Sequence, residues 1–349
     1  MARIWWIGLA AALGALAAYL LLWPVPIEPA SWSPPKAPEL AGVYMPNEAL
    51  AGTVRIEVGF APESVTVDAS GRVYAGLEDG SIVRWVDGGV EVIAELDGRA
   101  LGMGFDADGS LIACDLNGRL LSIDEEGVVD LVSEVDGRPL GLVNDLDLGE
   151  DGTIHFSESS TETTDTLLDL LEHRGNGRLL SYDPTTAETT VLLDGLFYAN
   201  GVAVSADGAF VLVVETTEYR VTRLWLAGPR AGERDVFIDN LPGFPDGISC
   251  GADGVFWLAL MNPRNGFIDW ALERPWIRRV AARLPIAAFA GAAPRYGFVL
   301  GLNADGNVIH NLQDPSGKHF AGISCVVREG AFLYFGSLLE HAIGRTVAP

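Results

Sequence analysis

Residues 201–212 read Gly-Val-Ala-Val-Ser-Ala-Asp-Gly-Ala-Phe-Val-Leu, and this pattern decides the fold. Short, mostly apolar runs lie on both sides of an Asp-Gly pair, which is a strong local signal for a β-hairpin. Related stretches surround turn glycines along the chain, from Gly71 to Gly330. Most gaps between these glycines are about 40 to 55 residues. This spacing is typical of the four-stranded blades of a β-propeller.

The number of blades depends on one short gap. Gly306 lies only 24 residues before Gly330, which is too short for four strands. We therefore assign Phe298–Asn311 to the outer hairpin of the fifth blade. The repeat Gly-Ile-Ser-Cys, which begins at Gly247 and again at Gly322, opens the fifth and sixth blades. The sequence predicts an all-β fold, a six-bladed propeller whose ring is closed by a strand from near the start of the domain.

The N-terminal part of the chain has a different composition. Ile4–Trp23 contains no charged residue, and twenty residues can cross a bilayer as a helix. Arg3 precedes this run and an acidic segment follows it, so the positive-inside rule leaves the N-terminus in the cytoplasm and exports the rest. A cleaved signal peptide is the alternative, although its apolar region is normally shorter.

We divide the chain into three parts. Residues 1–25 are a transmembrane signal anchor, residues 26–50 are a Pro-rich extended tether that holds the propeller off the membrane, and residues 51–349 are the propeller. A helical insertion interrupts the fifth blade at residues 262–295. Its segment 268–284 is basic and amphipathic and is expected to kink at Pro275. It either caps the propeller or contacts anionic lipid as a second membrane partner.

Charge limits the possible partners. The formal net charge is −24, and such an acidic surface repels phosphate backbones. Nucleic acid is therefore excluded as a partner. A small-molecule substrate and the membrane remain.

Four oxygen-bearing side chains occupy one phase of the repeat. Each lies eight residues before a turn glycine, and equal phase means equivalent positions in successive blades. They are Glu63, Asn144, Asn200 and Asp246. The innermost strand of each blade lines the channel, so these residues are expected to meet at its mouth. Two carboxylates and two amides favour Ca²⁺, with Mg²⁺ a weaker fit. The second and sixth blades present Leu101 and Gly322 at this phase, which predicts an open side for a ligand.

Several longer motifs resemble the strictosidine synthase-like branch of six-bladed propellers, including its membrane-anchored members. That branch is related to the gluconolactonase/SMP-30 and paraoxonase lactonases. The motifs are Ala61-Pro-Glu-Ser-Val65, Tyr198-Ala-Asn-Gly-Val-Ala-Val-Ser205, Val214-Glu-Thr-Thr217, Asn240-Leu-Pro-Gly-Phe-Pro-Asp-Gly-Ile248 and, in the insertion, Glu273-Arg-Pro-Trp-Ile-Arg-Arg279. The resemblance implies that the calcium ligands of the wider superfamily fall on the same four residues.

The resemblance also has two gaps. Strictosidine synthases use a glutamate near the start of the last blade, where this chain has Ala321-Gly322, so strictosidine synthase activity is not expected. Paraoxonases use a histidine in the second blade, where this chain has Leu101 to Gly104. The usual catalytic bases of both relatives are therefore missing.

Two functions fit these observations. The first is a calcium-dependent hydrolase of lactones or aryl esters, in which the metal polarises the carbonyl and Asp246 or Glu63 takes the proton of the attacking water. The second is a non-catalytic, membrane-tethered binding module with a structural calcium. The run Gly247-Ile-Ser-Cys-Gly251 matches a hydrolase elbow in letters only, because a hairpin follows it. His155 is interpreted as a structural residue of a strand.

Overall fold

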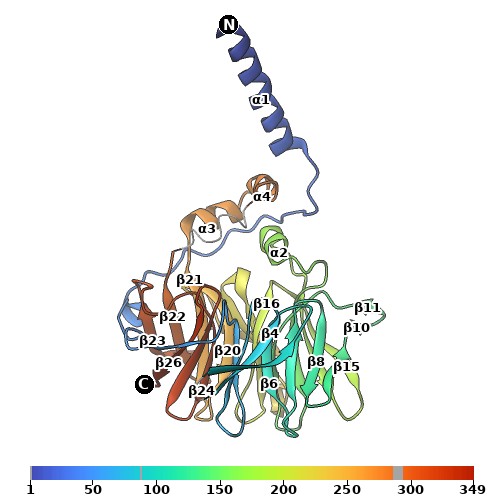
Figure 1. Cartoon of the computed structure of the whole chain (residues 1–349), viewed down its shortest axis with the longest axis vertical. Helices are drawn as coiled ribbons and strands as arrows, with labels where there is room; N and C mark the ends of the chain where they lie inside the picture. The colour runs from blue at the N-terminus through green and yellow to red at the C-terminus, as the bar shows by residue number, and fades with distance from the viewer. Residues whose placement is uncertain (1, 87–88, 286–293) are drawn as a thin grey trace.

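The turn glycines adopt the conformation that the hairpins require. Gly208 and Gly254 have φ values of 65° and 76°, and each joins two antiparallel strands. Side chains are strained at such positive φ, so glycine favours these turns. The computed structural model describes residues 2–86, 89–285 and 294–349. In these residues the turns build six four-stranded sheets arranged as a propeller (Figure 1).

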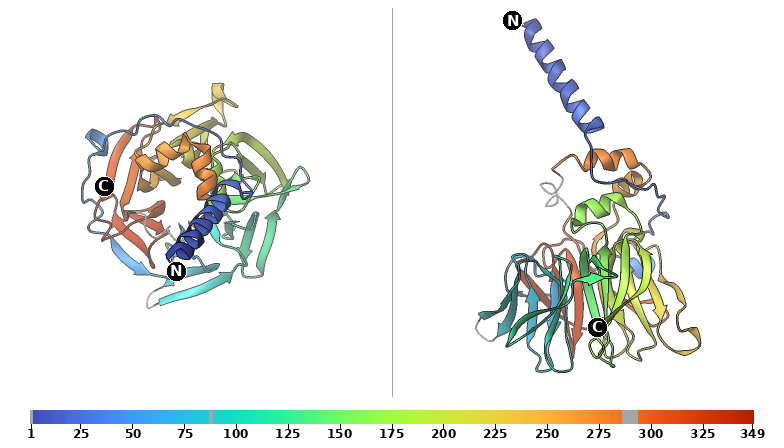
Figure 2. Two further views of the ribbon diagram at one scale, coloured as in Figure 1. Left: turned by 90° about the horizontal axis from the view of Figure 1, so that it is seen from above. Right: turned by 90° about the vertical axis from the view of Figure 1, so that its right-hand side faces the viewer.

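The blades follow one another along the chain, and in each the first strand is innermost (Figure 2). From the inside outward, blade one contains β2 (Ser64–Val67), β3 (Val73–Gly76), β4 (Ser81–Val86) and β5 (Gly89–Glu95), and blade two contains β6 (Ala100–Phe105), β7 (Leu111–Asp115), β8 (Arg119–Asp124) and β9 (Gly127–Val132). Blade three contains β12 (Leu142–Leu148), β13 (Ile154–Ser160), β14 (Gly177–Asp183) and β15 (Glu188–Leu196), and blade four contains β16 (Ala199–Val204), β17 (Phe210–Glu215), β18 (Arg220–Trp225) and β19 (Arg234–Ile238). Blade five contains β20 (Gly243–Cys250), β21 (Phe256–Pro263), β22 (Gly297–Leu302) and β23 (Val308–Asp314), and blade six contains β24 (Ile323–Glu329), β25 (Phe332–Ser337), β26 (Ala342–Val347) and β1 (Val54–Glu57).

The ring closes between the two ends of the domain. Strand β1 pairs antiparallel with β26, for example Ile56 opposite Ile343, so the first strand completes the last blade. Strands β22 and β23 join β20 and β21 in one sheet, as the short gap before Gly330 indicated. Both predictions are confirmed, and the propeller has six blades. A small hairpin, β10 (Glu134–Val135) with β11 (Arg138–Pro139), lies outside the blades.

The core lies between neighbouring blades. Phe210 of the fourth blade and Phe256 of the fifth are buried with ring centroids 5.7 Å apart, and Leu258 and Phe298 belong to the same apolar cluster. Similar clusters fill the other contacts between blades. Burial of these side chains stabilises the ring and fixes the spacing of the inner strands.

Short helices cover one end of the channel. Helix α2 (Thr166–Glu172) follows β13, while α3 (Gly266–Leu272) and α4 (Pro275–Ala281) follow β21. In each of these blades the second strand ends beside the start of the innermost strand, because the two are antiparallel. The three helices therefore rise from the end of the ring at which the inner strands begin (Figures 1 and 2). We call α2, α3 and α4 the cap.

The expected single helix with a kink is two helices in the structure. Glu273 and Arg274 lie between α3 and α4, and Pro275 is the first residue of α4. Proline is favoured there because it lacks an N–H group and its φ suits a helix start. The part of the predicted insertion at residues 286–293 lies outside the described residues.

Residues 27–50, which we call the strap, are extended as expected, with a single turn of 3-10 helix at Gly42–Tyr44. They are not a free linker, because they lie against the cap and the fifth blade (Figure 2). Ile27 is 5% exposed and Leu50 is fully buried. Backbone N–H groups of Ala30 and Trp32 donate to Glu172 O and Leu272 O at 3.0 and 3.1 Å. The expected spacer is thus part of the folded domain.

Helix α1 (Ala2–Leu22) precedes the strap and stands apart from the propeller (Figure 1). Its segment Ile4–Leu22 has a mean hydropathy of 1.9 and is 0% buried. Its length and composition would allow it to cross a membrane.

Candidate functional site at the channel mouth

Three of the predicted residues lie in the same irregularity of three inner strands. Asn144, Asn200 and Asp246 fall where the register with the second strand shifts, so that two residues of the inner strand face one of its partner. Such a β-bulge turns a side chain out of the regular alternation. Repetition of the bulge in blades three, four and five gives these residues equivalent positions at the capped end of the channel. Glu63 directly precedes β2, and its N–H donates to Gly76 O at 3.1 Å.

The structure joins two of the four residues directly. Asn200 Nδ2 donates to Asp246 Oδ1 at 2.7 Å, across the contact between the fourth and fifth blades. Glu63 is close enough that its charge raises the pKa of Asp246, after burial as the larger cause. Asn144 lies on β12, next to β16 in the ring, and is 5% exposed. The four residues thus come from inner strands that surround one channel.

Glycine permits the close approach of the fourth and fifth blades. A Cβ atom on Gly201 would lie 2.5 Å from both Asp246 O and Ile248 N. No side chain fits at that distance unless the backbone shifts. Gly201 follows Asn200 directly, so the residue that brings the strands together also sets the contact between Asn200 and Asp246.

A pair of hydroxyl groups holds the two amides. Asn144 Nδ2 donates to Ser159 Oγ at 2.9 Å, and Asn200 Nδ2 is 3.2 Å from Thr216 Oγ1. Each hydroxyl in turn donates to a backbone carbonyl of the next blade, Ala199 O at 2.6 Å and Pro245 O at 2.8 Å. These side chains were not predicted from the sequence, although Glu158-Ser-Ser160 and Glu215-Thr-Thr217 carry a readable repeat.

The glutamate of each repeat holds the chain just before the site. Glu158 accepts the N–H of Gly141 at 2.7 Å, and Glu215 accepts the N–H of Phe197 at 3.1 Å. In both blades the bonded N–H lies three residues before the site asparagine. Both carboxylates are fully buried and are paired with arginines, Arg178 and Arg220, at 2.6 and 2.8 Å. Paired and hydrogen-bonded buried carboxylates restrain the backbone around them.

An arginine lies on the side of the site where the sequence predicted an opening. Arg99, from the loop before β6, forms an ion pair with Glu63 at 2.9 Å and with Glu78 at 3.0 Å, and it also donates to Ala61 O at 2.9 Å. The phase argument missed Arg99 because this residue lies two positions before Leu101. The guanidinium therefore occupies space beside Glu63 that the sequence left to a ligand.

The equivalent position in the sixth blade is Ser324 and not Gly322. Paired residues Val326 and Phe335 are nine positions apart, whereas their counterparts Val202 and Val213 are eleven apart. The hairpin of the sixth blade is therefore two residues shorter, and counting back from its glycine gives the wrong residue. Ser324 is buried, and its Oγ donates to Glu63 O at 2.7 Å.

Negative charge exceeds positive charge at this end of the channel. Burial raises the pKa of Glu63, with Arg99 opposing the rise. Burial and then the charge of Glu63 raise the pKa of Asp246 well above its usual value. Asp145, which follows Asn144, has its pKa raised to about 7, mainly by burial, with Asp147 and Glu63 as further causes. Carboxyl groups that raise one another's pKa in this way ionise more easily when a cation is bound beside them.

The donor set fits a hard cation if the amides take part. Within residues 2–86, 89–285 and 294–349, no three His, Cys, Asp or Glu side chains form a group that could hold a metal. The two carboxylates alone are therefore too few, and Asn144 and Asn200 would supply the remaining protein oxygens. The Asn144 amide already offers its nitrogen to Ser159, which leaves its oxygen on the other side. In Asn200, rotation of the amide would exchange Nδ2 for Oδ1 beside Asp246.

A cavity of about 300 Å³ lies along the channel away from the cap. Inner strands of several blades line it, including Thr66, Met103, Asp147, Ser249 and Arg328. Asp147 accepts Val204 N–H at 2.8 Å, so this carboxylate serves to join two inner strands.

The remaining sequence candidates have structural positions. His155 is buried on β13, the second strand of its blade, opposite Ser181. Ser249 lies on β20 and donates to Val326 O at 2.6 Å, so Gly247–Cys250 belongs to a strand and the motif is not a hydrolase elbow. Cys114, Cys250 and Cys325 are free thiols.

Comparisons with known proteins identify the family. The family model described as strictosidine synthase matches residues 144–229, and the one described as strictosidine synthase-like, N-terminal, matches residues 42–85. The chain is 35% identical over 327 residues to the protein strictosidine synthase-like 10 of Arabidopsis thaliana, covering 84% of this chain and 87% of the relative. The chain belongs to the strictosidine synthase-like family. Another relative is the human adipocyte plasma membrane-associated protein, 34% identical over 349 residues, covering 91% and 83% of the two chains.

Solved structures share the propeller of this strictosidine synthase-like chain. A gluconolactonase from Xanthomonas campestris superposes with a TM-score of 0.63 at 18% identity, covering 85% of this chain and 88% of the other. Regucalcin from Agrobacterium tumefaciens, described as a calcium-binding protein, gives a TM-score of 0.57 at 17% identity, covering 84% and 90%. At these identities the likeness shows the fold alone.

Proposed function

We propose that the protein is a calcium-dependent hydrolase of lactones or aryl esters, with its site at the capped mouth of the channel. The observation that carries this proposal is the repeated bulge, which brings Asn144, Asn200 and Asp246 to equivalent positions near Glu63. A gluconolactonase and a calcium-binding protein among the structural neighbours support it. Mg²⁺ fits less well, because a rigid ring of blades rarely provides its small octahedron.

Each residue of the site has a separate role in this proposal. Glu63, Asn144, Asn200 and Asp246 would hold the cation, which would polarise the substrate carbonyl and stabilise the negative charge that develops on its oxygen. Asp246 or Glu63 would accept a proton from the attacking water, because both carboxylates are buried at the mouth. Ser159 and Thr216 orient the amides, and Arg99 holds Glu63 in place.

A non-catalytic binding module is the second candidate. Arg99 pairs with Glu63 where a ligand was expected to enter, and the described chain places neither a histidine in the second blade nor a glutamate at residues 321–322. In this alternative the calcium is structural, and the propeller presents a surface to a partner.

We also propose that α1 anchors the protein in a membrane, with the N-terminus in the cytoplasm and the propeller on the exported side. The apolar, unburied helix Ile4–Leu22 supports the anchor, and a relative is a plasma membrane-associated protein. Arg3 and the acidic chain after the helix support the orientation.

One experiment separates the hydrolase from the binding module. Bound metal, thermal stability with calcium or chelator, and turnover of a panel of lactones and aryl esters are measured for the wild type, Asn200→Ala and Asn200→Asp. The hydrolase predicts calcium in the wild type and in Asn200→Asp, which keeps an oxygen ligand, and loss of metal and turnover in Asn200→Ala. Calcium-dependent stability without turnover of any substrate would favour the binding module. Absence of bound calcium in the wild type would contradict both.

A further inference from the structure

A group of large apolar side chains lies exposed on the cap. Phe267, Ile268 and Trp270 of α3 are 66%, 40% and 44% exposed, and Trp276 of α4 is 62% exposed. Other residues of the same helices are buried, namely Ala271 and Leu272 at the C-terminal end of α3 and Arg278 in α4. We call the four exposed residues the cap patch. Two exposed tryptophans and an exposed phenylalanine within ten residues are unusual on a water-exposed surface, and the rings of Phe267 and Trp270 lie 5.6 Å apart.

The cap patch cannot turn inward, because the cap is firmly held. Arg278 is 3% exposed, and its guanidinium donates to four backbone carbonyls, those of Ala30, Leu171, Glu172 and Leu272. One arginine thereby joins the strap to all three helices of the cap. Tyr219 on the propeller donates to Asp269 of α3 at 2.9 Å.

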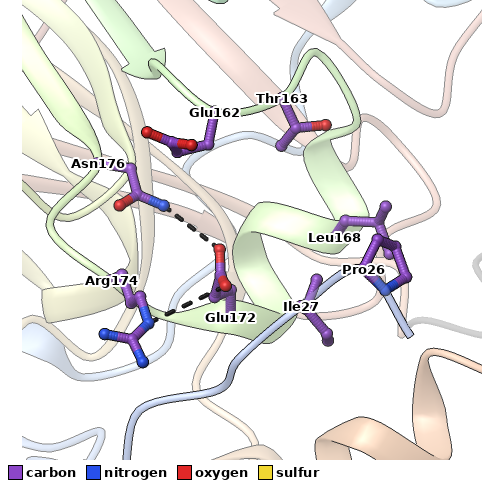
Figure 3. A pocket seen from close by; sticks show the side chains of 8 residues that line it. All are labelled: Pro26, Ile27, Glu162, Thr163, Leu168, Glu172, Arg174 and Asn176. Carbon is purple, nitrogen blue, oxygen red and sulfur yellow. Dashed lines mark hydrogen bonds and ion pairs between the residues drawn. The ribbon is translucent and has the colours of Figure 1, made fainter. Parts of the chain in front are cut away.

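The strap also packs on α2. A cavity of about 330 Å³ remains between them, lined by Pro26, Ile27, Glu162, Thr163, Leu168, Glu172, Arg174 and Asn176 (Figure 3). Glu172 lies at its centre, with Arg174 and Asn176 on one side (Figure 3). Glu172 Oε1 also accepts the N–H of Glu28 at 2.7 Å. The entry of the strap is therefore fixed to the cap by its backbone.

The end of α1 touches the end of the cap. Arg283, just after α4, donates to Leu20 O at 3.0 Å and to Trp23 O at 2.7 Å, while Tyr19 Oη donates to Arg283 O at 3.1 Å. Only four residues separate Leu22, the last of α1, from the buried Ile27, a reach of at most about 17 Å. Tyr19 and Trp23 are side chains of the kind that lie at the interface of a membrane. A bilayer around α1 would therefore reach the level of the cap.

We propose that the cap patch contacts the surface of the bilayer on the side at which the C-terminal end of α1 emerges. The channel mouth under the cap then faces the membrane. This inference rests on the membrane anchor of the proposed function, but not on the proposed hydrolase activity. Trp270 and Trp276 would lie at the headgroup level, and Phe267 and Ile268 would enter the acyl boundary.

The surroundings of the patch fit lipid better than a second protein. Overall charge is −24, but the cap bears arginines, and Arg279 is exposed beside the patch. Arg274 lies over the ring of Trp270 at 4.6 Å, which places a cation next to an interfacial aromatic side chain. Cationic and aromatic residues together are typical of surfaces that rest on phospholipid. Arg278 is not available for such a contact, because its side chain is buried inside the cap.

Photocrosslinking in a bilayer tests whether the cap patch contacts lipid. The full chain is reconstituted in phosphatidylcholine vesicles with benzoylphenylalanine in place of Trp270, Trp276, Leu13 or Phe332, one at a time. Leu13 lies in the middle of α1 and reports insertion of the anchor. Phe332 is a matched control, since it is a 36% exposed aromatic residue that begins β25, beside the turn at Gly330.

Each outcome has a defined meaning. We expect phospholipid adducts at Leu13, Trp270 and Trp276 and only background at Phe332. Adducts at Leu13 without adducts at either tryptophan would overturn the proposed contact between the cap patch and lipid, but would still support the membrane anchor. A crosslink between two chains at Trp276 would instead identify the patch as a contact between copies, which also overturns it. The absence of a lipid adduct at Leu13 would show that α1 is not inserted in the bilayer. That result would overturn this inference, whatever the hydrolase assays show.

Discussion

Asn200 Nδ2 and Asp246 Oδ1 are 2.7 Å apart, and this hydrogen bond connects the inner strands of the fourth and fifth blades. The bond satisfies a buried carboxylate whose pKa is raised well above its usual value, mainly by burial and then by Glu63. A bound cation would stabilise the ionised Asp246 carboxylate in place of this hydrogen bond. Substitution of Asp246 therefore tests whether the site binds a cation.

Asp246→Asn should therefore remove the response to calcium. Without calcium, the variant should be as stable as the wild type or more so, since one of two repelling buried carboxylates is lost. Wild type with calcium at about a hundred times its dissociation constant should gain about 2.7 kcal/mol in free energy of unfolding. Denaturant unfolding with calcium and with chelator measures both quantities. A variant that keeps the full calcium effect would show that Asp246 is not a ligand.

Arg99→Gln should make the protein depend more on calcium. Loss of Arg99 leaves the largely buried Glu63 carboxylate without its cation, and we expect a loss of about 1–3 kcal/mol in the free energy of unfolding when calcium is absent. Added calcium should restore more stability in this variant than in the wild type. Arg230→Gln, which breaks surface pairs with both Glu233 and Asp235, is the control and should cost about 1 kcal/mol or less. Equal calcium effects in wild type and Arg99→Gln would contradict the proposed link between Arg99 and the site.

Gly201→Ala should disturb the site through packing alone. The added methyl group would lie 2.5 Å from Asp246 O, so the fifth blade must move. We expect a loss of about 1–3 kcal/mol in the free energy of unfolding, together with weaker calcium binding. Gly52→Ala is the matched control, because no heavy atom lies within 4 Å of its Cβ position. An unchanged stability in Gly201→Ala would mean that the two blades are less tightly packed than the structure shows.

His155 should make the protein less stable in acid. Burial lowers the pKa of His155 to about 4, below its ordinary value of 6.5, so the folded state binds fewer protons than the unfolded state between these values. Stability from this group is complete above about pH 6.5 and is lost as the pH falls towards 4, by about 3 kcal/mol in all. His155→Gln should reduce the decrease measured by denaturant unfolding. The difference between variant and wild type at pH 8 measures packing, and only its change with pH reports ionisation. A constant difference from pH 8 to pH 4 would rule out this role.

Arg278→Met should loosen the cap while leaving the blades folded. Carbonyls of Ala30, Leu171, Glu172 and Leu272 would lose their donor. We expect faster hydrogen exchange at the N–H groups of Ala30 and Trp32, which bond to the cap. Arg279→Met, on the exposed side of the same helix, should leave exchange unchanged. Similar exchange in both variants would show that the strap is held without Arg278.

Local sequence signals were sufficient for the fold. Asp-Gly and Asn-Gly turns report the conformation of two or three residues, and their spacing reports the length of a blade. The same logic found Glu63, Asn144, Asn200 and Asp246, because equal loop lengths place equal phases at equal positions. Blade six has a shorter hairpin, and there the count gave Gly322 where the structure has Ser324.

Other features required the three-dimensional structure. Arg99 reaches Glu63 from another blade, and Arg278 binds the strap through Ala30, 248 residues away in the chain. No local pattern encodes such contacts, since they depend on how packed blades and helices bring distant backbone together. Sequence patterns alone were enough to predict six blades, an apolar helix and four oxygen-bearing side chains at equivalent positions of the ring. The arginine beside Glu63, and the cap that the strap holds over this end of the channel, became visible only in the folded structure, because these contacts join segments far apart in the chain.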